Sequence, residues 1–434
     1  MSHHFDKSRE ANELRKSGQY QEALVLYREL SKDYFDSFTA AGLLHCLRKL
    51  GLFEEALPLC TETLQRHRAF DWCRNEVIWT LIQGKLEKLD ESASIEETVS
   101  VAESILALKP KENATKWRIA RQVLKAAKSY SRWEIISQWL DRVNPDELSM
   151  EPMKDAQGKE GWCDQAIWNN YRIRSMVETG DKEQAISLAQ VAISRFPRQS
   201  KFFKRLEALA TVRLTRLADA EKIYSAICST GKPDWWILHE HAQVMRELGK
   251  LEDALRLMCR AAVSHKKLES LVSLFSDIGF LCSELKLRED ARNHLLLCKY
   301  VREEQGWSIP RSIEIALSNL GNEGSEQISP TNLKDSLRKC RTFWFRTIGV
   351  QDDPRAQSIR SKKIKQTLQG KLILGHSERP FSFISSANGN SYFCLKSDLP
   401  KGITDGASLV FDAIPSLDKK KQKESWKAVN IRSA

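Results

Sequence analysis

The chain has 434 residues, 41% of them apolar and 29% charged, which is typical of soluble globular proteins with room for two or three domains. No apolar run reaches the roughly 18–20 residues that a membrane-spanning helix needs, and the first 16 residues contain no apolar signal segment, so we expect a cytoplasmic protein with no membrane partner. The net charge of +11 lies at one end, since residues 331–434 carry 20 Lys and Arg against 9 Asp and Glu, whereas residues 1–330 carry 48 of each. This polarity predicts a neutral scaffold joined to a module that contacts a polyanion.

An internal repeat fills the first three quarters of the chain. Its pattern is a Gly, a large residue two positions later, an Ala five positions later, and further apolar residues at helical spacing. Clear copies begin at Gly18, Gly51, Gly180 and Gly249, and weaker ones begin at Arg216 and Leu285. The aligned alanines are Ala23, Ala56, Ala185, Ala220, Ala254 and Ala291, and neighbours within each group lie 33 to 37 residues apart.

This period is that of a helical hairpin. Gly allows the left-handed turn that ends one helix, and Ala allows the next helix to pack closely against its neighbour. A pair of helices cannot bury its apolar stripe alone, so successive copies are expected to stack. We count six reasonable copies over residues 1–320 and one or two divergent ones between about 72 and 161, where residues 151–161 look like an inserted loop.

The repeat resembles the tetratricopeptide repeat family. The residues that carry the resemblance are Gly18, Tyr20, Ala23 and Tyr27 in one copy and Gly180, Ala185, Ala189, Ala192 and Pro197 in another. The resemblance implies an α-solenoid with a groove that binds a protein or peptide. Some members of the family clamp a terminal carboxylate with basic residues on first helices, and here Lys204, Arg205, Arg172 and Arg174 are candidates; the alternative is that they are solvated.

A polar linker, residues 321–332, separates the repeats from a basic helical connector at 333–368. Residues 333–349 have an apolar helical stripe that includes Phe343 and Trp344, and we expect this helix to dock on the last repeat. The following helix is basic, and its Lys362, Lys363 and Lys365 are candidates for contacts with phosphates. The alternative is a solvated connector.

Five short alternating segments follow between residues 369 and 434, separated by turn sequences. They predict a small five-stranded β-barrel. Because side chains alternate along a strand, Phe381 and Phe383 share one face while Ser382 and Ile384 share the other. A barrel of this size needs one face for its core, so two phenylalanines on the outer face would form a stacking platform for unpaired bases.

The order of these segments resembles the cold-shock domain, an oligonucleotide-binding barrel. The resemblance rests on Arg379-Pro-Phe-Ser-Phe-Ile384, on Tyr392-Phe-Cys394, and on the later segments DGASLVFDAI and KAVNIR. It implies that Phe381, Phe383 and Phe393 stack on bases while Lys371, Arg379 and Lys396 hold phosphates. Where the family has a Trp and a Phe on its first strand, this chain has Leu374 and Gly375, so a barrel that contacts protein remains the alternative.

No constellation typical of an enzyme is present: the sequence has no P-loop, GxSxG, dinucleotide fingerprint, CxxC or HExxH. We therefore expect a non-enzymatic protein with no cofactor and no metal, in which cysteines and histidines are packed in the core. The sequence predicts an α+β multidomain chain, an α-solenoid of tetratricopeptide-like helical hairpins followed by a five-stranded barrel. The predicted function is an adaptor that binds single-stranded RNA or DNA through the barrel and a protein through the repeats. The alternative is a protein-interaction scaffold or regulatory subunit throughout.

Overall fold

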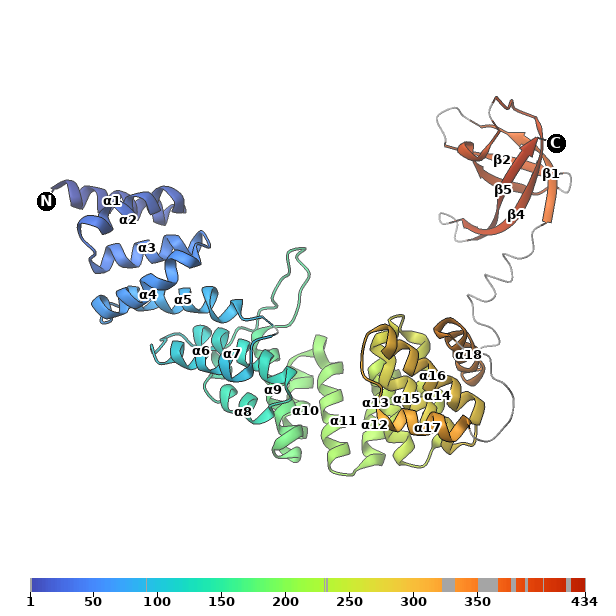
Figure 1. Cartoon of the computed structure of the whole chain (residues 1–434), viewed down its shortest axis with the longest axis horizontal. Coiled ribbons are helices and arrows are strands. Elements are labelled where there is room, and N and C mark those ends of the chain that lie inside the picture. Colours follow the sequence, from blue (N-terminus) through green and yellow to red (C-terminus); the bar gives the residue numbers. More distant parts are fainter. Residues whose placement is uncertain are drawn as a thin grey trace. The chain divides into compact units, whose positions relative to one another are not determined.

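A computed structural model describes residues 2–90, 92–229, 231, 233–321, 332–349, 366–375, 380–386, 389–400, 402–418 and 423–433 (Figure 1). For residues 2–3, 366, 414–418 and 423–425 it describes the backbone alone. The chain divides into two compact units, Met1–Pro233 and Asp234–Ala434, and each is described by itself.

The first unit is built from antiparallel helix pairs (Figure 1). Its helices are α1 (Ser2–Lys16), α2 (Tyr20–Asp33), α3 (Ser37–Lys49), α4 (Phe53–His67), α5 (Asp71–Gly84), α6 (Ile95–Leu106), α7 (Asn113–Ser129), α8 (Trp133–Leu140), α9 (Asp164–Thr179), α10 (Lys182–Arg195), α11 (Ser200–Arg213) and α12 (Leu217–Ser229).

The second unit continues the pairing with α13 (Trp235–Glu247), α14 (Leu251–Ser264), α15 (Val272–Glu284) and α16 (Arg288–Glu304). Two further helices follow, α17 (Arg311–Gly321) and α18 (Leu333–Thr347). The predicted helical-repeat fold is confirmed, although α6 departs from regular pairing because it packs mainly against α7 and only slightly against α5.

The repeat alanines explain why these helices pair. All six of the aligned alanines lie on the second helix of a pair and are completely buried: Ala23, Ala56, Ala185, Ala220, Ala254 and Ala291. A larger side chain at such a position would have to displace its neighbours, because close-packed interiors have no room for extra methylenes. The predicted role of the alanine is therefore confirmed in every copy.

The turn between paired helices is left-handed in three of the four clear copies of the repeat, as predicted. Gly180 is the exception, since its φ of −106° is extended, and Asp181 caps α10 there by accepting from the backbone N–H groups of Glu183 and Gln184. Gly18, Gly51 and Gly249 have φ of 84°, 75° and 77°, and the residue after each donates a backbone hydrogen bond to the carbonyl five positions earlier. In the two weaker copies the same turn is made by Thr215 (φ 59°) and Lys286 (φ 61°). A residue with a β-carbon pays about 1–2 kcal/mol for this conformation, which glycine avoids.

We therefore expect Lys286→Gly to raise the free energy of unfolding by about 1 kcal/mol, since Lys286 is exposed and its backbone already has the conformation that glycine prefers. Urea denaturation of the two chains measures the difference. A matched control is Lys222→Gly inside α12, which should instead lower the free energy of unfolding by about 1 kcal/mol. A loss of stability in the Lys286 variant would contradict this account of the weaker copies.

The divergent part of the repeat comprises α5 to α8, which share a core of large side chains that includes Trp117 and Trp139. The predicted insertion lies between α8 and α9 as a loop. Lys154 and Glu160 pair across it as an isolated antiparallel bridge.

The helix α18 packs against α14 and α16, as predicted for the first part of the connector. Trp344 is buried, stacks on Phe275 at a ring-centroid distance of 5.7 Å, and donates its indole N–H to Nε2 of His294 at 2.8 Å. His294 is fully buried, which matches the prediction of packed histidines. Buried aromatic contacts therefore hold this helix against α16, and the ion pair of Arg346 with Asp290 adds a charged contact.

The C-terminal strands form a closed barrel in the order β1-β2-β3-β5-β4. They are β1 (Gln366–Ile373), β2 (Phe381–Ser386), β3 (Ser391–Leu395), β4 (Ser408–Asp418) and β5 (Lys423–Ser433). All neighbouring pairs are antiparallel except β3–β5, which is parallel. The predicted α+β class, a helical solenoid followed by a five-stranded barrel, is confirmed.

One boundary differs from the sequence interpretation. The basic connector helix was expected to reach residue 368, but residues 366–368 belong to β1, where Leu368 pairs with Phe411 of β4. Leu368 and Leu372 lie on the inward face of the strand and pack in the barrel core. The alternation of a strand, not a helical stripe, accounts for Leu368.

Gly370 lies between those two leucines, at the closest approach of β1 and β2. A β-carbon at this position would lie 2.6 Å from the carbonyl oxygen of Ser385, which the packed strands cannot accommodate. The glycine that opens the predicted first strand is therefore needed for closure of the barrel.

Candidate nucleic-acid interface

Three phenylalanine rings form a cluster on the outer face of the barrel. Phe381 and Phe383 alternate along β2 with the buried Ser382 and Ile384, which are 1% and 0% exposed. The ring of Phe393 on β3 lies 5.5 Å from that of Phe381 and 6.1 Å from that of Phe383, measured between centroids. Phe383 is 39% exposed, so the cluster presents an aromatic surface to solvent.

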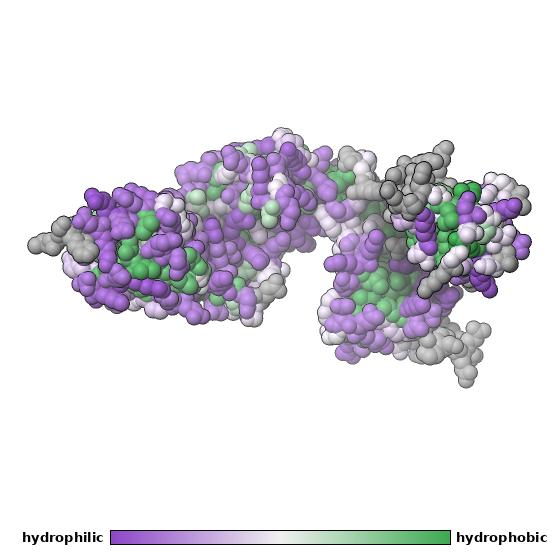
Figure 2. All heavy atoms as spheres, turned by 90° about the horizontal axis from the view of Figure 1, so that it is seen from above, coloured by the Kyte–Doolittle hydropathy of each residue, from purple (hydrophilic) through white to green (hydrophobic). Residues whose placement is uncertain are grey.

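The phenylalanines are outside because the core is already filled by the other face of each strand. The inward residues are Leu372, Ile384, Tyr392, Cys394, Leu409, Phe411, Ala413, Ala428 and Ile431. Figure 2 shows apolar side chains among polar ones on the visible face of the barrel. An exposed group of rings that the core does not need is a candidate binding surface.

Strand register extends this cluster into a row across four strands. Phe383 lies directly opposite Ile373 of β1 on one side and Phe393 on the other. Phe393 in turn pairs with Lys427 of β5, the single register pair between β3 and β5 among the described residues. We call Ile373, Phe383, Phe393 and Lys427 the ring row.

A polar row runs beside the ring row. Lys371 of β1 lies opposite Ser385 of β2, which lies opposite Ser391 of β3. Lys371 is exposed and forms no ion pair with any residue that the structure describes. The outer face of β1, β2 and β3 thus combines aromatic rings with a cation and hydroxyl groups, the side-chain types that contact single-stranded nucleic acids in general.

Of the other basic candidates, the structure describes Lys396 alone. Lys396 begins a short 3-10 helix, η5 (Lys396–Asp398), directly after β3, and its backbone N–H donates to the carbonyl of Pro380 at 3.0 Å, beside Phe381. Arg379, Lys362, Lys363 and Lys365 lie outside the described residues. The structure therefore brings the three phenylalanines together, places Lys371 on the same outer face by register, and fixes only the backbone of Lys396 near Phe381.

Two residues of the ring row were missed by sequence reasoning. The resemblance to the cold-shock domain points to Leu374 and Gly375 on the first strand and not to Ile373, but Leu374 packs partly in the core. The alternation of β1 around the buried Leu372 identifies Ile373, 49% exposed, as an outward residue. No local signal reveals Lys427, because its place beside Phe393 depends on a parallel pair between strands far apart in sequence.

Four basic residues of the repeats are candidates for a carboxylate clamp, and the two on α9 form ion pairs with acidic residues of the same unit. Arg172 is paired with Asp141 and lies over the Trp168 ring, and Arg174 is paired with Glu178. Lys204 and Arg205 lie on the next first helix, α11. The charges of both α9 arginines are thus already compensated within the unit.

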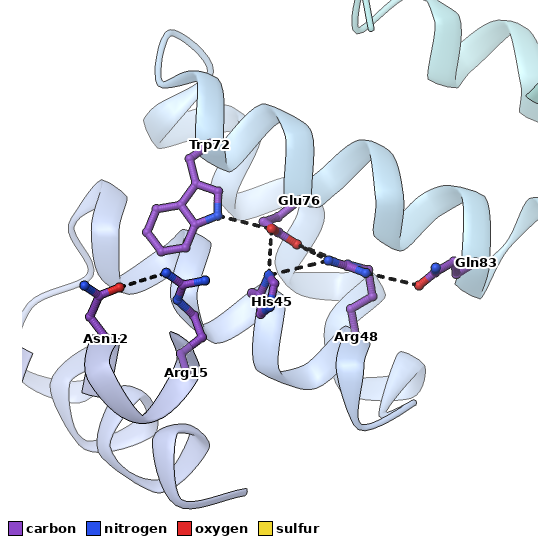
Figure 3. A network of polar contacts seen from close by, with 7 residues as sticks. All are labelled: Asn12, Arg15, His45, Arg48, Trp72, Glu76 and Gln83. Atoms are coloured by element: carbon purple, nitrogen blue, oxygen red, sulfur yellow. Dashed lines mark hydrogen bonds and ion pairs between the residues drawn. The ribbon is translucent and has the colours of Figure 1, made fainter. Parts of the chain in front are cut away.

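A polar network joins the first helices α3 and α5, and Arg15 of α1 lies over the ring of Trp72 with its guanidinium carbon 4.7 Å from the centroid (Figure 3). Glu76 of α5 accepts from Nε and Nη2 of Arg48 at 3.1 and 2.9 Å, and its other oxygen lies 2.8 Å from Nδ1 of His45. Trp72 Nε1 also donates to this carboxylate, at 3.1 Å. Burial raises the pKa of Glu76, but the His45 hydrogen bond and the Arg48 charge outweigh it, so the pKa is lowered overall.

A similar contact occurs in the second unit, where Nε2 of His239 on α13 lies 2.7 Å from Asp277 on α15. Both networks link the first helices of successive pairs, so they hold the repeats in register. Among the described residues there is no group of three or more His, Cys, Asp or Glu that could hold a metal ion.

In the part of the chain that the structure describes, no helix has the length and apolar character needed to cross a bilayer. The molecule thus joins helical repeats to a closed five-stranded barrel whose outer face carries the ring row.

No family model matches this sequence, and no curated protein matches it either. The structure is similar to a tetratricopeptide repeat protein from Parabacteroides merdae, with 12% identity, coverage of 63% of this chain and 98% of that chain, and a TM-score of 0.31. It is also similar to a tetratricopeptide repeat protein of Thermus thermophilus (15% identity, 56% and 98% covered, TM-score 0.22). A third similar structure is the TPR2AB domain of yeast Sti1 in a complex with pHSP90. The identity is 13%, the match covers 74% of this chain and 99% of that chain, and the TM-score is 0.25. At such identities and TM-scores, these structures assign no ligand or partner to this chain.

Proposed function

We propose that this chain is a non-enzymatic adaptor whose barrel binds single-stranded RNA or DNA while its tetratricopeptide-like repeats bind a protein. The observation that carries the proposal is the outward cluster of Phe381, Phe383 and Phe393, whose ring centroids lie 5.5–6.1 Å from one another. Each ring face accepts an unpaired base, and such stacking is worth about 1–3 kcal/mol per base.

The barrel topology supports this proposal. The structure contains a closed five-stranded barrel with strand order β1-β2-β3-β5-β4. In small five-stranded barrels that bind oligonucleotides, the face of the second and third strands contacts the ligand. The rings of this chain lie on those two strands. The cold-shock resemblance points to the same face.

Charge supports a polyanionic ligand. The 20 basic residues against 9 acidic ones after residue 330 favour phosphate contacts, which make affinity depend on salt. The test is a fluorescence-anisotropy titration of the intact chain with a labelled single-stranded 12-mer and its duplex at several salt concentrations. We expect the single strand to bind more tightly and its affinity to fall steeply with salt. Equal binding of the two forms would contradict stacking, and no binding would remove the proposal.

The protein-binding half of the proposal rests on the first helices of the repeats. One exposed aromatic side chain, Phe38 (59% exposed), lies at the N-terminal end of α3 and contacts the half-buried rings of Phe70 and Trp72 at the start of α5. Aromatic residues in this setting are typical of protein interfaces. Affinity purification of the intact chain with and without nuclease should recover a partner that nuclease does not release.

A second function is favoured by one observation. Ile373, directly opposite Phe383, makes one end of the ring row aliphatic, as expected for a surface that contacts protein side chains. In that case the whole chain is a protein-interaction scaffold. The two functions separate in the same titration, because a protein-binding barrel would give no salt-dependent binding of the 12-mer.

A further inference from the structure

The end of the ring row at β5 carries a charge pair that no sequence pattern reveals. Lys427 lies beside Phe393 in the register, and its neighbour Ala428 is fully buried, so Lys427 occupies the outer face with the rings. Its ammonium group lies 3.9 Å from a carboxylate oxygen of Asp398, at the end of η5. No other ion pair of Lys427 is found among the described residues.

This pair is weak and accessible. The side chains of Lys427 and Asp398 are 29% and 39% exposed, and a separation of 3.9 Å is too long for a hydrogen bond. Exposed pairs of this kind contribute little to stability, because water already solvates both charges. A phosphate oxygen at normal hydrogen-bond distance would be a stronger partner for the lysine.

We infer that Lys427 is a phosphate-binding residue at the end of the ring row and that Asp398 lowers the affinity by competing for it. This inference rests on the proposed nucleic-acid function. A strand whose bases stack on Phe383 and Phe393 brings its backbone to Lys427, and the phosphate must displace Asp398. The carboxylate thus lowers the affinity by occupying the lysine, rather than by repelling the ligand directly.

The test uses the intact chain and the labelled single-stranded 12-mer. Lys427→Gln should weaken binding about three- to fivefold and reduce the slope of log affinity against log salt by about 0.7, as expected for one lost phosphate contact on a single strand. Asp398→Asn should tighten binding about three- to fivefold at low salt, an amount typical of removing an exposed charge interaction.

The double variant separates competition from general repulsion. If Asp398 acts through Lys427, the gain from Asp398→Asn should largely disappear in the Lys427→Gln background. Matched controls are Asp219→Asn and Lys222→Gln, which break the exposed ion pair of α12 and should leave affinity unchanged.

Three results would overturn the inference: an unchanged salt slope in Lys427→Gln, no gain in Asp398→Asn, or a gain that persists in the double variant. In each of these cases the wild-type chain still binds, so the proposed function stands. Absence of wild-type binding would remove both.

Discussion

Replacing Phe383 and Phe393 together with alanine is expected to weaken binding of a single-stranded oligonucleotide at least tenfold. A base that can no longer stack on a ring loses about 1–3 kcal/mol of binding free energy. A change of about 1.4 kcal/mol corresponds to a tenfold change in affinity. Phe383 is the most exposed of the three rings, so its removal takes little from the core. The measurement is anisotropy with the intact chain at fixed salt.

The matched control for this double variant is Phe38→Ala, which removes an exposed phenylalanine from α3 and should not change the affinity. Circular dichroism checks that each variant is folded. An unchanged affinity of the double variant, in a chain that still folds, would show that the rings do not stack on bases and would favour the protein-contact alternative.

The second large effect concerns His294, which holds α18 in place. Its Nδ1 lies 2.6 Å from the carbonyl of Asp290, so that nitrogen carries the proton and Nε2 accepts from Trp344. Protonation of Nε2 would remove this acceptor and place a charge among the rings of Phe343 and Trp344. Burial lowers the pKa of His294 from 6.5 to about 4.

The direction of the pH effect follows from this depressed pKa. The folded chain holds His294 neutral, whereas the unfolded chain takes up a proton near pH 6.5, so stability is lost as pH falls from 6.5 toward 4. A pKa difference of this size between the folded and the unfolded chain lowers the free energy of unfolding by about 3 kcal/mol. Hydrogen exchange of the α18 amides, corrected for the intrinsic rate, measures it as a fall in the free energy of local opening.

His294→Gln is the matched variant, because glutamine cannot take up the proton. It should start less stable than the wild type, and the difference between the two chains should shrink as the pH falls. A stability difference between the two chains that stays constant from pH 7 to pH 4 would contradict the assigned role of His294. The carboxylates of the chain do not affect this difference, because they are the same in both chains.

Much of the helical fold could be predicted because its determinants are local. The six alanines recur 33 to 37 residues apart within two groups, and every one of them is buried on the second helix of a pair. Copies with Thr215 or Lys286 at the turn looked weaker because a left-handed conformation is not evident from these residue types.

The contacts that were missed are non-local. The pairing of His45 with Glu76 and of His239 with Asp277 joins separate helices, and no spacing rule within one helix predicts it. The partnership of Phe393 with Lys427 depends on the parallel closure of the barrel. Alternation along β2 predicted the outward rings, whereas the residues that complete their row required the register of three other strands.

The most direct test of the account is photocrosslinking of the intact chain to a single-stranded oligonucleotide that carries photoreactive bases, with the attachment sites located by mass spectrometry. We predict crosslinks in the peptides that contain Phe383 and Phe393, reduced by a competing unlabelled single strand and by high salt. Crosslinks confined to the helical repeats, or none at a concentration that saturates the chain, would contradict the claim that the outer face of the barrel binds unpaired bases.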